Sequence, residues 1–114
     1  MIKRTNILQL NLAGTQFQDY NKSSLLFFDI ETTGLSARMS YIYLIGVIAW
    51  EDNVWKCTQW FAENTNDEPV ILQEFLSYSQ SKSLLIHFNG DRFDIPYINE
   101  KCEAYHLNIT LSSI

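Results

Sequence analysis

An uninterrupted apolar run that ends in acidic residues is the clearest feature of the hydrophobic pattern. Residues 24–30 read SLLFFDI, and four apolar residues in a row precede Asp29. A continuous run of this length, without alternation, is typical of a strand buried on both faces of a sheet. Glu31 follows Asp29 by two positions, so in an extended strand both side chains project from one face, about 7 Å apart along the chain. The pattern therefore predicts a central strand, Ser24–Ile30, that leads into paired carboxylates.

Two further strands follow and form a hairpin. Tyr41–Trp50 and Val54–Phe61 are rich in β-branched and aromatic residues, which are the types that strands favour. The polar turn at residues 51–53 is short, and a connection of this length joins antiparallel neighbours. Thr33 and Gly34 supply a turn signal between the first strand and the hairpin.

Helical periodicity appears in the second half of the chain, on either side of one more strand. Apolar residues share one face of a helix from Pro69 to about Gln80, and proline suits a first helical turn. Ser83–Phe88, SLLIHF, predicts a strand, which should be parallel to its sheet neighbour because a helix leads into it. A second helix should run from Phe93–Pro96 to about His106. The order β-β-β-α-β-α predicts an α/β fold, with helices packed against a hairpin-led mixed sheet.

Length and composition fit one domain. The chain has 114 residues, of which 46% are hydrophobic and 18% are charged, as in a folded globular protein. We interpret residues 1–23 as a lead-in segment, a short strand or helix that packs on the domain edge, and residues 24–114 as the domain. Within it, residues 108–114 are interpreted as another β-type segment or a frayed end.

Charge and cysteine content narrow the class of protein. The net charge of −5 argues against an extended electrostatic footprint for duplex nucleic acid. It does not exclude a nucleic acid substrate, because carboxylates that attract metal ions lower the net charge while the metals meet the phosphate. Cys57 and Cys102 form no CxxC pattern, and neither a signal peptide nor a membrane-spanning run is recognisable. We therefore expect a soluble cytoplasmic protein with free thiols and no membrane partner.

The paired carboxylates are the first candidate for chemistry. Placing the carboxylates of Asp29 and Glu31 beside a buried run costs folding free energy, since desolvated like charges repel and resist ionisation. Divalent cations relieve that cost and favour hard oxygen ligands. Asp94 begins the second helix just beyond a strand end, where α/β active sites usually lie, and is expected to complete a metal site with them. The alternatives are solvated acids at a strand end and, for Asp94, a helix cap.

Two motifs then resemble a known family. FDIETTGL and NGDRFDIP resemble the motifs of the DEDD-type 3′–5′ exonucleases of the ribonuclease H-like superfamily. The second motif of that family has the form N-x-x-x-F-D, which Asn89, Phe93 and Asp94 match. The D-I-P-Y-I continuation is similar to the proofreading domains of family B DNA polymerases. ETTGL followed by YIYLIGV is closer still to the bacterial YprB-like predicted exonucleases. The resemblance covers about Leu25 to Tyr105.

The resemblance implies a role for each matching residue. Asp29, Glu31 and Asp94 would be catalytic and would hold two Mg²⁺ or Mn²⁺ ions about 4 Å apart, which stabilise the attacking and leaving oxygens at phosphorus. The substrate would be the single-stranded 3′ end of DNA or RNA. The residues implied to bind it are Thr33, Gly34, Leu35, Asn89 and Phe93.

One part of the family pattern has no match. The family has a fourth carboxylate on a later helix, with a Tyr or His a few residues before it as general base, whereas this sequence has no acidic residue after Glu103. Glu100 and Glu103 should point away from the strand ends. We therefore expect an incomplete copy of the fold, with weak or absent activity. The alternative function is a non-catalytic nucleic acid or protein interaction module, and an uncovered sheet edge leaves homo-oligomerisation open.

Overall fold

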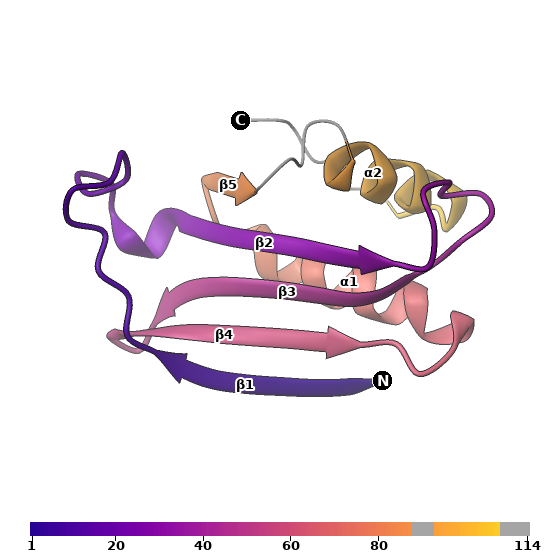
Figure 1. Cartoon of the computed structure of the whole chain (residues 1–114), viewed down its shortest axis with the longest axis horizontal. Helices are drawn as coiled ribbons and strands as arrows, with labels where there is room; N and C mark the ends of the chain where they lie inside the picture. Colours follow the sequence, from indigo (N-terminus) through magenta and orange to yellow (C-terminus); the bar gives the residue numbers. More distant parts are fainter. Residues whose placement is uncertain (88–92, 108–114) are drawn as a thin grey trace.

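The computed structural model describes residues 1–87 and 93–107. Within them, a five-stranded sheet runs in the order β1-β4-β3-β2-β5 (Figure 1). Two α-helices and two short 3₁₀ helices complete the order of elements. Along the chain these elements are β1 (Ile2–Leu8), η1 (Lys22–Ser24), β2 (Leu25–Thr32), β3 (Ile42–Glu51), β4 (Val54–Phe61), η2 (Thr65–Asp67), α1 (Glu68–Ser79), β5 (Leu84–His87) and α2 (Asp94–Ala104).

The predicted α/β fold with a mixed sheet is confirmed. Strand β3 is the middle strand of the sheet. The predicted central strand, β2, lies next to it inside the sheet, antiparallel to β3 and parallel to the edge strand β5. Strands β3 and β4 form the expected antiparallel hairpin, and both residues of its turn, Asp52 and Asn53, have positive φ angles (53° and 63°). Short polar side chains tolerate this left-handed backbone better than most residues do. The segment 108–114 lies outside the described residues.

Strand β1 is an addition to the predicted order of elements. It pairs with β4 in antiparallel register from Ile2 opposite Phe61 to Leu8 opposite Trp55. The hydrophobic pattern did not distinguish a strand from a helix for residues 2–8, and the structure gives a physical reason. Every side chain from Ile2 to Ile7 is exposed, so burial imposes no alternation on this edge strand.

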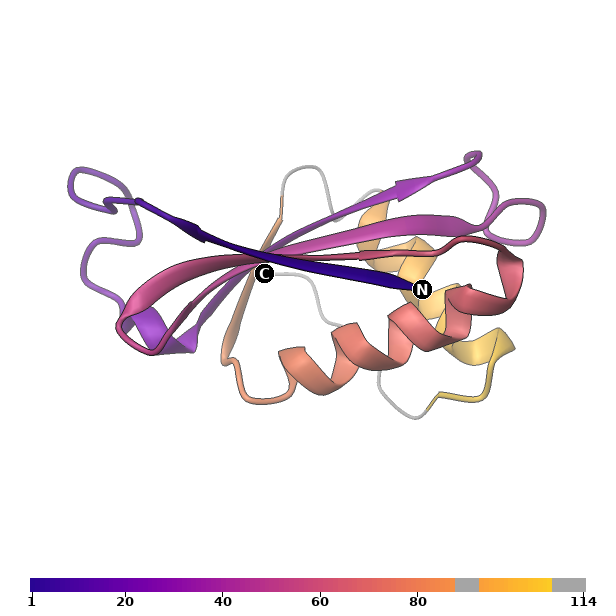
Figure 2. The ribbon, with the colours of Figure 1, turned by 90° about the horizontal axis from the view of Figure 1, so that it is seen from below.

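The main core lies on one face of the sheet. Helices α1 and α2 both cover this face, as Figure 2 shows. Its contact surface includes Ile30, Ile45 and Trp60 from the strands, and Phe75 and Ile98 from the helices, all nearly or fully buried. This packing fixes the face of β2 that carries Leu26, Phe28 and Ile30, so that Asp29 and Glu31 project from the opposite face.

The opposite face carries a smaller apolar cluster. Leu12, Leu25 and Trp55 are buried in it, and the segment before β2 packs on it through Phe17, whose ring centroid lies 5.7 Å from that of Phe27. Cys57 and Cys102 are both free thiols, as expected. In the described part of the chain, no helix has the length and apolar character needed to cross a membrane.

Candidate functional site

The carboxylates of β2 stand on the face of the sheet that the helices leave uncovered. Asp29 and Glu31 are both exposed, while Ile30 between them is buried in the main core. The register places Gly46 opposite Asp29, so no side chain of β3 covers that carboxylate. The pairing shifts register between Glu31 and Thr32, and irregularities of this kind commonly redirect side chains at sites. The strand thus presents two accessible acids.

Asp94 reaches these acids from the first turn of α2. Its side chain is buried, with 4% exposed. The carboxyl group accepts a hydrogen bond from the backbone N–H of Ile30 and lies within hydrogen-bonding reach of the Asp29 carboxyl group. The helix therefore holds Asp94 against the end of β2, and the predicted meeting of the two motifs in space is observed for Asp29 and Asp94.

The environment of Asp94 favours its neutral form. Burial, then the neighbouring Asp29 carboxyl, and to a smaller extent the charge of Glu31 together raise the pKa of Asp94 to about 7, against the opposing effect of the Ile30 N–H. Two ionised carboxylates cannot donate to each other, so one proton or one cation between them lowers the energy of the pair. Burial and the contact with Asp29 distinguish Asp94 from an aspartate that only caps a helix in solvent.

The donor set suits a hard divalent cation, although it is not preassembled around one. Oδ2 of Asp94 is buried without a hydrogen-bond partner, and a bound cation would satisfy it. Over residues 1–87 and 93–107, however, no three His, Cys, Asp or Glu side chains are arranged to hold a metal ion as they stand. Asp29 and Asp94 are in contact, and Glu31 acts on Asp94 through its charge. Glu31 would have to move to join the ligands.

The predicted substrate residues of the first motif begin a tightly hydrogen-bonded loop. We call residues 33–41 the substrate loop, after the predicted role of Thr33, Gly34 and Leu35. The N–H of Thr33 donates to the carbonyl of Tyr41 and the N–H of Tyr41 donates to Oγ1 of Thr33, both at 3.0 Å. A Cβ at Gly34 would lie only 3.2 Å from Cβ of Ser40, so any larger residue would require the Ser40 side chain to shift. Leu35 is 87% exposed, as an apolar residue that contacts a base would be.

The residues of the second motif are described only in part. Phe93 is half-buried, packs against the main core and has its ring centroid 5.3 Å from that of Tyr97. It therefore supports α2 next to Asp94. Asn89 lies outside the described residues.

A buried polar cluster beneath the substrate loop was not predicted from the sequence. Glu68 is 1% exposed and accepts hydrogen bonds from the Ile42 N–H (2.6 Å) and from the hydroxyl of Tyr105. Nζ of Lys101 lies 3.2 Å from Oε1 of Glu68 and donates to the carbonyl of Ser40 at 2.7 Å. Lys101 is only 8% exposed. The signal for this in the sequence is its position three residues after Ile98, on the apolar side of the second helix, where lysine is rare.

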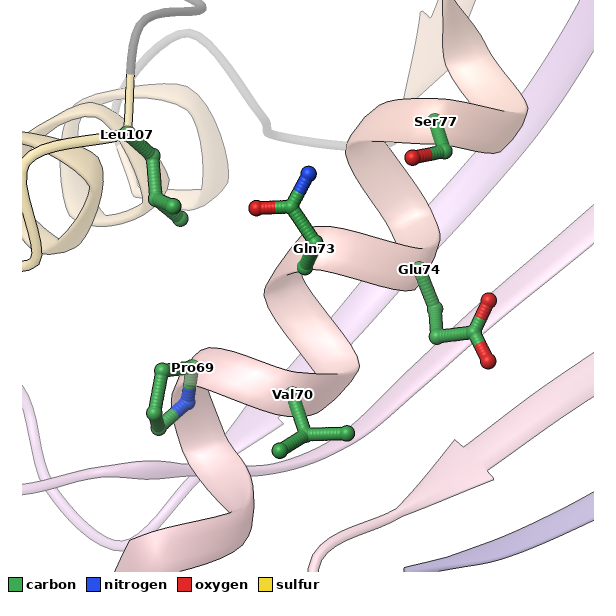
Figure 3. A pocket seen from close by; sticks show the side chains of 6 residues that line it. All are labelled: Pro69, Val70, Gln73, Glu74, Ser77 and Leu107. Atoms are coloured by element: carbon green, nitrogen blue, oxygen red, sulfur yellow. The ribbon is translucent and has the colours of Figure 1, made fainter.

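Two hollows on the surface differ in their relation to this cluster. A pocket of about 510 Å³ opens between the substrate loop and the ends of the two helices, and Lys101 and Tyr105 line it. A second, of about 470 Å³, lies on the outer face of α1 (Figure 3), where Val70 and Leu107 give it an apolar character. The second hollow contains none of the candidate site residues.

Comparisons with known proteins agree with the geometry. Residues 26–114 match the family RNase_H_2, described as RNase_H superfamily. The chain is also 37% identical over 84 residues to the uncharacterized protein YprB of Bacillus subtilis (strain 168), a match that covers 72% of this chain and 20% of that protein. The chain thus spans about a fifth of the length of this curated relative. By the family match over most of its length, the chain belongs to the RNase_H superfamily.

Proposed function

We propose that this chain carries the catalytic carboxylates of a metal-dependent 3′–5′ exonuclease of the DEDD type. The observation that supports it most is the contact between the buried Asp94 and Asp29 beside Glu31 on the open face of the sheet. Members of the superfamily are commonly nucleases that use divalent metals. Mg²⁺ or Mn²⁺ would supply Lewis acid stabilisation of the attacking and leaving oxygens at phosphorus.

The proposed function assigns some residues to metal binding and others to substrate binding. Asp29 and Asp94 would hold metal, with Glu31 completing the ligands, and the unpartnered Oδ2 of Asp94 would gain its missing partner. The substrate would be a single-stranded 3′ end, since a single strand can offer its terminal base to the exposed Leu35. Thr33, Gly34, Phe93 and Asn89 remain the further proposed substrate residues.

A non-catalytic nucleic acid interaction module is the second candidate. It is favoured by the absence, among the described residues, of a three-ligand metal arrangement. In such a module the superfamily fold and the substrate loop would bind nucleic acid without hydrolysing it.

Manganese titration separates the two candidates. Binding of Mn²⁺ is followed by calorimetry for the wild-type chain and for Asp29→Asn and Asp94→Asn, with Asp52→Asn as the matched control. Asp52 is an exposed acid in the hairpin turn, 82% exposed at its side chain and paired with Lys56. We expect Mn²⁺ binding by the wild type and by Asp52→Asn, and its loss in the two site variants. Equal binding by all four proteins would refute the proposed metal site.

An activity assay then tests the direction of cleavage. A 5′-labelled single-stranded DNA or RNA oligonucleotide is incubated with the chain and Mn²⁺, and the products are separated by length. The proposed function predicts slow, stepwise shortening from the 3′ end that disappears in Asp29→Asn. Oligonucleotide binding with no shortening, unaffected by Mn²⁺, would instead support the interaction module.

A further inference from the structure

The substrate loop is held far more firmly than its exposure suggests. It projects beyond the end of β2 and presents Leu35 and Met39, which are 87% and 89% exposed. A free loop with two apolar side chains in water would sample many conformations, and ordering it would cost affinity for a ligand. The contacts beneath this loop remove much of that cost before a ligand arrives.

Ser40 is the centre of these contacts. Its hydroxyl oxygen lies 2.6 Å from the carbonyl oxygen of Ser36 and 3.2 Å from that of Gly34, and it shares a hydrogen bond of 2.6 Å with the hydroxyl of Tyr97. The first two contacts close the loop on itself. The third ties it to α2, a different element far along the chain.

Lys101 ties the same residue to both helices. Its ammonium group donates to the Ser40 carbonyl at 2.7 Å and pairs at 3.2 Å with the buried Glu68 at the start of α1. Glu68 in turn accepts the Ile42 N–H where the substrate loop enters β3. Charge-assisted hydrogen bonds in a buried setting are stronger and more directional than exposed ones.

The contacts of Tyr97 and Lys101 with Ser40 form what we call the anchor of the substrate loop. Helix α2 connects this anchor to the carboxylate site. Asp94, Tyr97 and Lys101 are spaced three and four residues apart, which places all three on one side of the helix. One end of that row contacts Asp29, and the other two members contact Ser40. A rigid helix therefore sets the position of the loop relative to the carboxylates.

We infer that Ser40, Tyr97 and Lys101 are positioning residues, which hold the substrate loop so that Leu35 meets the terminal nucleotide at the carboxylate site. This inference rests on the proposed function, because the loop needs a nucleic acid to position. Residues with such a role affect the affinity for the nucleic acid strand and leave the affinity of the carboxylates for metal intact.

The test compares two variants with a matched control. Tyr97→Phe and Ser40→Ala each remove one hydroxyl from the anchor and leave no charge unpaired. Ser79→Ala is the control, because the Ser79 hydroxyl is also buried and donates to a backbone carbonyl (Leu76, 2.9 Å) but lies in α1. Affinity for a 5′-labelled single-stranded oligonucleotide is measured by fluorescence anisotropy with Ca²⁺ in place of Mn²⁺, and Mn²⁺ affinity by calorimetry.

We expect both test variants to bind the oligonucleotide about five- to tenfold more weakly, as for the loss of one hydrogen bond, and Ser79→Ala to bind it like the wild type. Mn²⁺ affinity should stay within about twofold in all of them. Unchanged oligonucleotide affinity in both variants, or a parallel loss of both affinities, would overturn the inference while leaving the proposed function intact. If the wild-type chain itself does not retain the oligonucleotide, the proposed function fails and the inference with it.

Discussion

The fold and the proposed chemistry favour opposite protonation states of the Asp94 carboxyl group. Burial favours the neutral form, whereas metal binding requires the ionised form. Burial, with Asp29 as the next contributor, raises the pKa of Asp94 to about 7. An unfolded aspartic acid has a pKa of 3.8, so between these two values the folded state binds a proton that the unfolded state has released. Folding therefore becomes less favourable as the pH rises through this window.

The free energy of unfolding of the metal-free protein should thus fall between about pH 4 and pH 7, because over this range only the folded state keeps a proton on Asp94. Asp94→Asn removes the titrating group, so its free energy of unfolding should fall less over the same window. The measurement is urea unfolding of both proteins in EDTA at several pH values. The difference between the two curves isolates Asp94, because carboxylates with a lowered pKa, such as Asp67, act below this window. Parallel curves would contradict the raised pKa.

At this scale the sequence revealed the acids but not their protonation or the anchor beneath the loop. Asp29 and Glu31 stand out because a buried strand precedes them, and the position of Asp94 at a helix start follows from its motif. Glu68 reads as one more polar residue before a helix. Its burial depends on Lys101 and Tyr105, which come from a distant part of the chain and reach it only through the packing of two helices.

At the scale of elements, the Glu68–Lys101 pair joins the start of α1 to α2. Both side chains are almost fully buried. Removing one member of a buried pair leaves the other charge without compensation, which costs about 3–5 kcal/mol. We therefore expect Lys101→Met to lower the free energy of unfolding by about that amount, measured by urea unfolding at neutral pH.

The control for this prediction is Lys56→Met, which breaks the exposed pair with Asp52. It should leave the unfolding midpoint nearly unchanged, because solvent screens surface pairs and side-chain entropy opposes them. The double variant Glu68→Gln/Lys101→Met should recover part of the loss. If Lys101→Met were no more destabilising than Lys56→Met, the pair would not link the two helices energetically.

Helices and central strands were predictable because their burial patterns are regular, whereas β1 was not. The apolar run of β2 and the one-sided apolar face of α1 directly reflect what each element packs against. Strand β1 has exposed side chains from Ile2 to Ile7, so its place in the sheet is set by backbone pairing with β4, which leaves little trace in the sequence.

The edge position of β1 leads to a prediction for the whole molecule. Deleting residues 1–8 would make β4 the edge strand in place of β1 and would remove the exposed charges of Lys3 and Arg4. Charged side chains on an edge strand discourage pairing with another chain. We expect the deletion variant to self-associate in sedimentation velocity experiments more than the full chain. Ile7→Glu is the control, because it changes an exposed side chain (69%) and keeps the β1 backbone. Equal sedimentation of all three proteins would argue against edge protection by β1.

The stability of the whole molecule should also report on the metal site, independently of catalysis. A ligand that binds only the folded state stabilises it by about 2.7 kcal/mol at a hundred times its dissociation constant. Mn²⁺ competes with the proton of Asp94 and binds the ionised carboxylates more tightly as the pH rises. Saturating Mn²⁺ should therefore raise the melting temperature more at about pH 8 than at about pH 5.

The opposite signs of the two pH effects make this a stringent test. Without metal, higher pH weakens the fold because Asp94 must ionise beside Asp29; with Mn²⁺, the ionised pair becomes the ligand set and higher pH strengthens the fold. Asp29→Asn should remove the stabilisation by Mn²⁺, whereas Asp52→Asn should keep it. An Mn²⁺ effect that is the same at both pH values, or that survives in Asp29→Asn, would place the bound ion elsewhere and separate the carboxylate pair from metal binding.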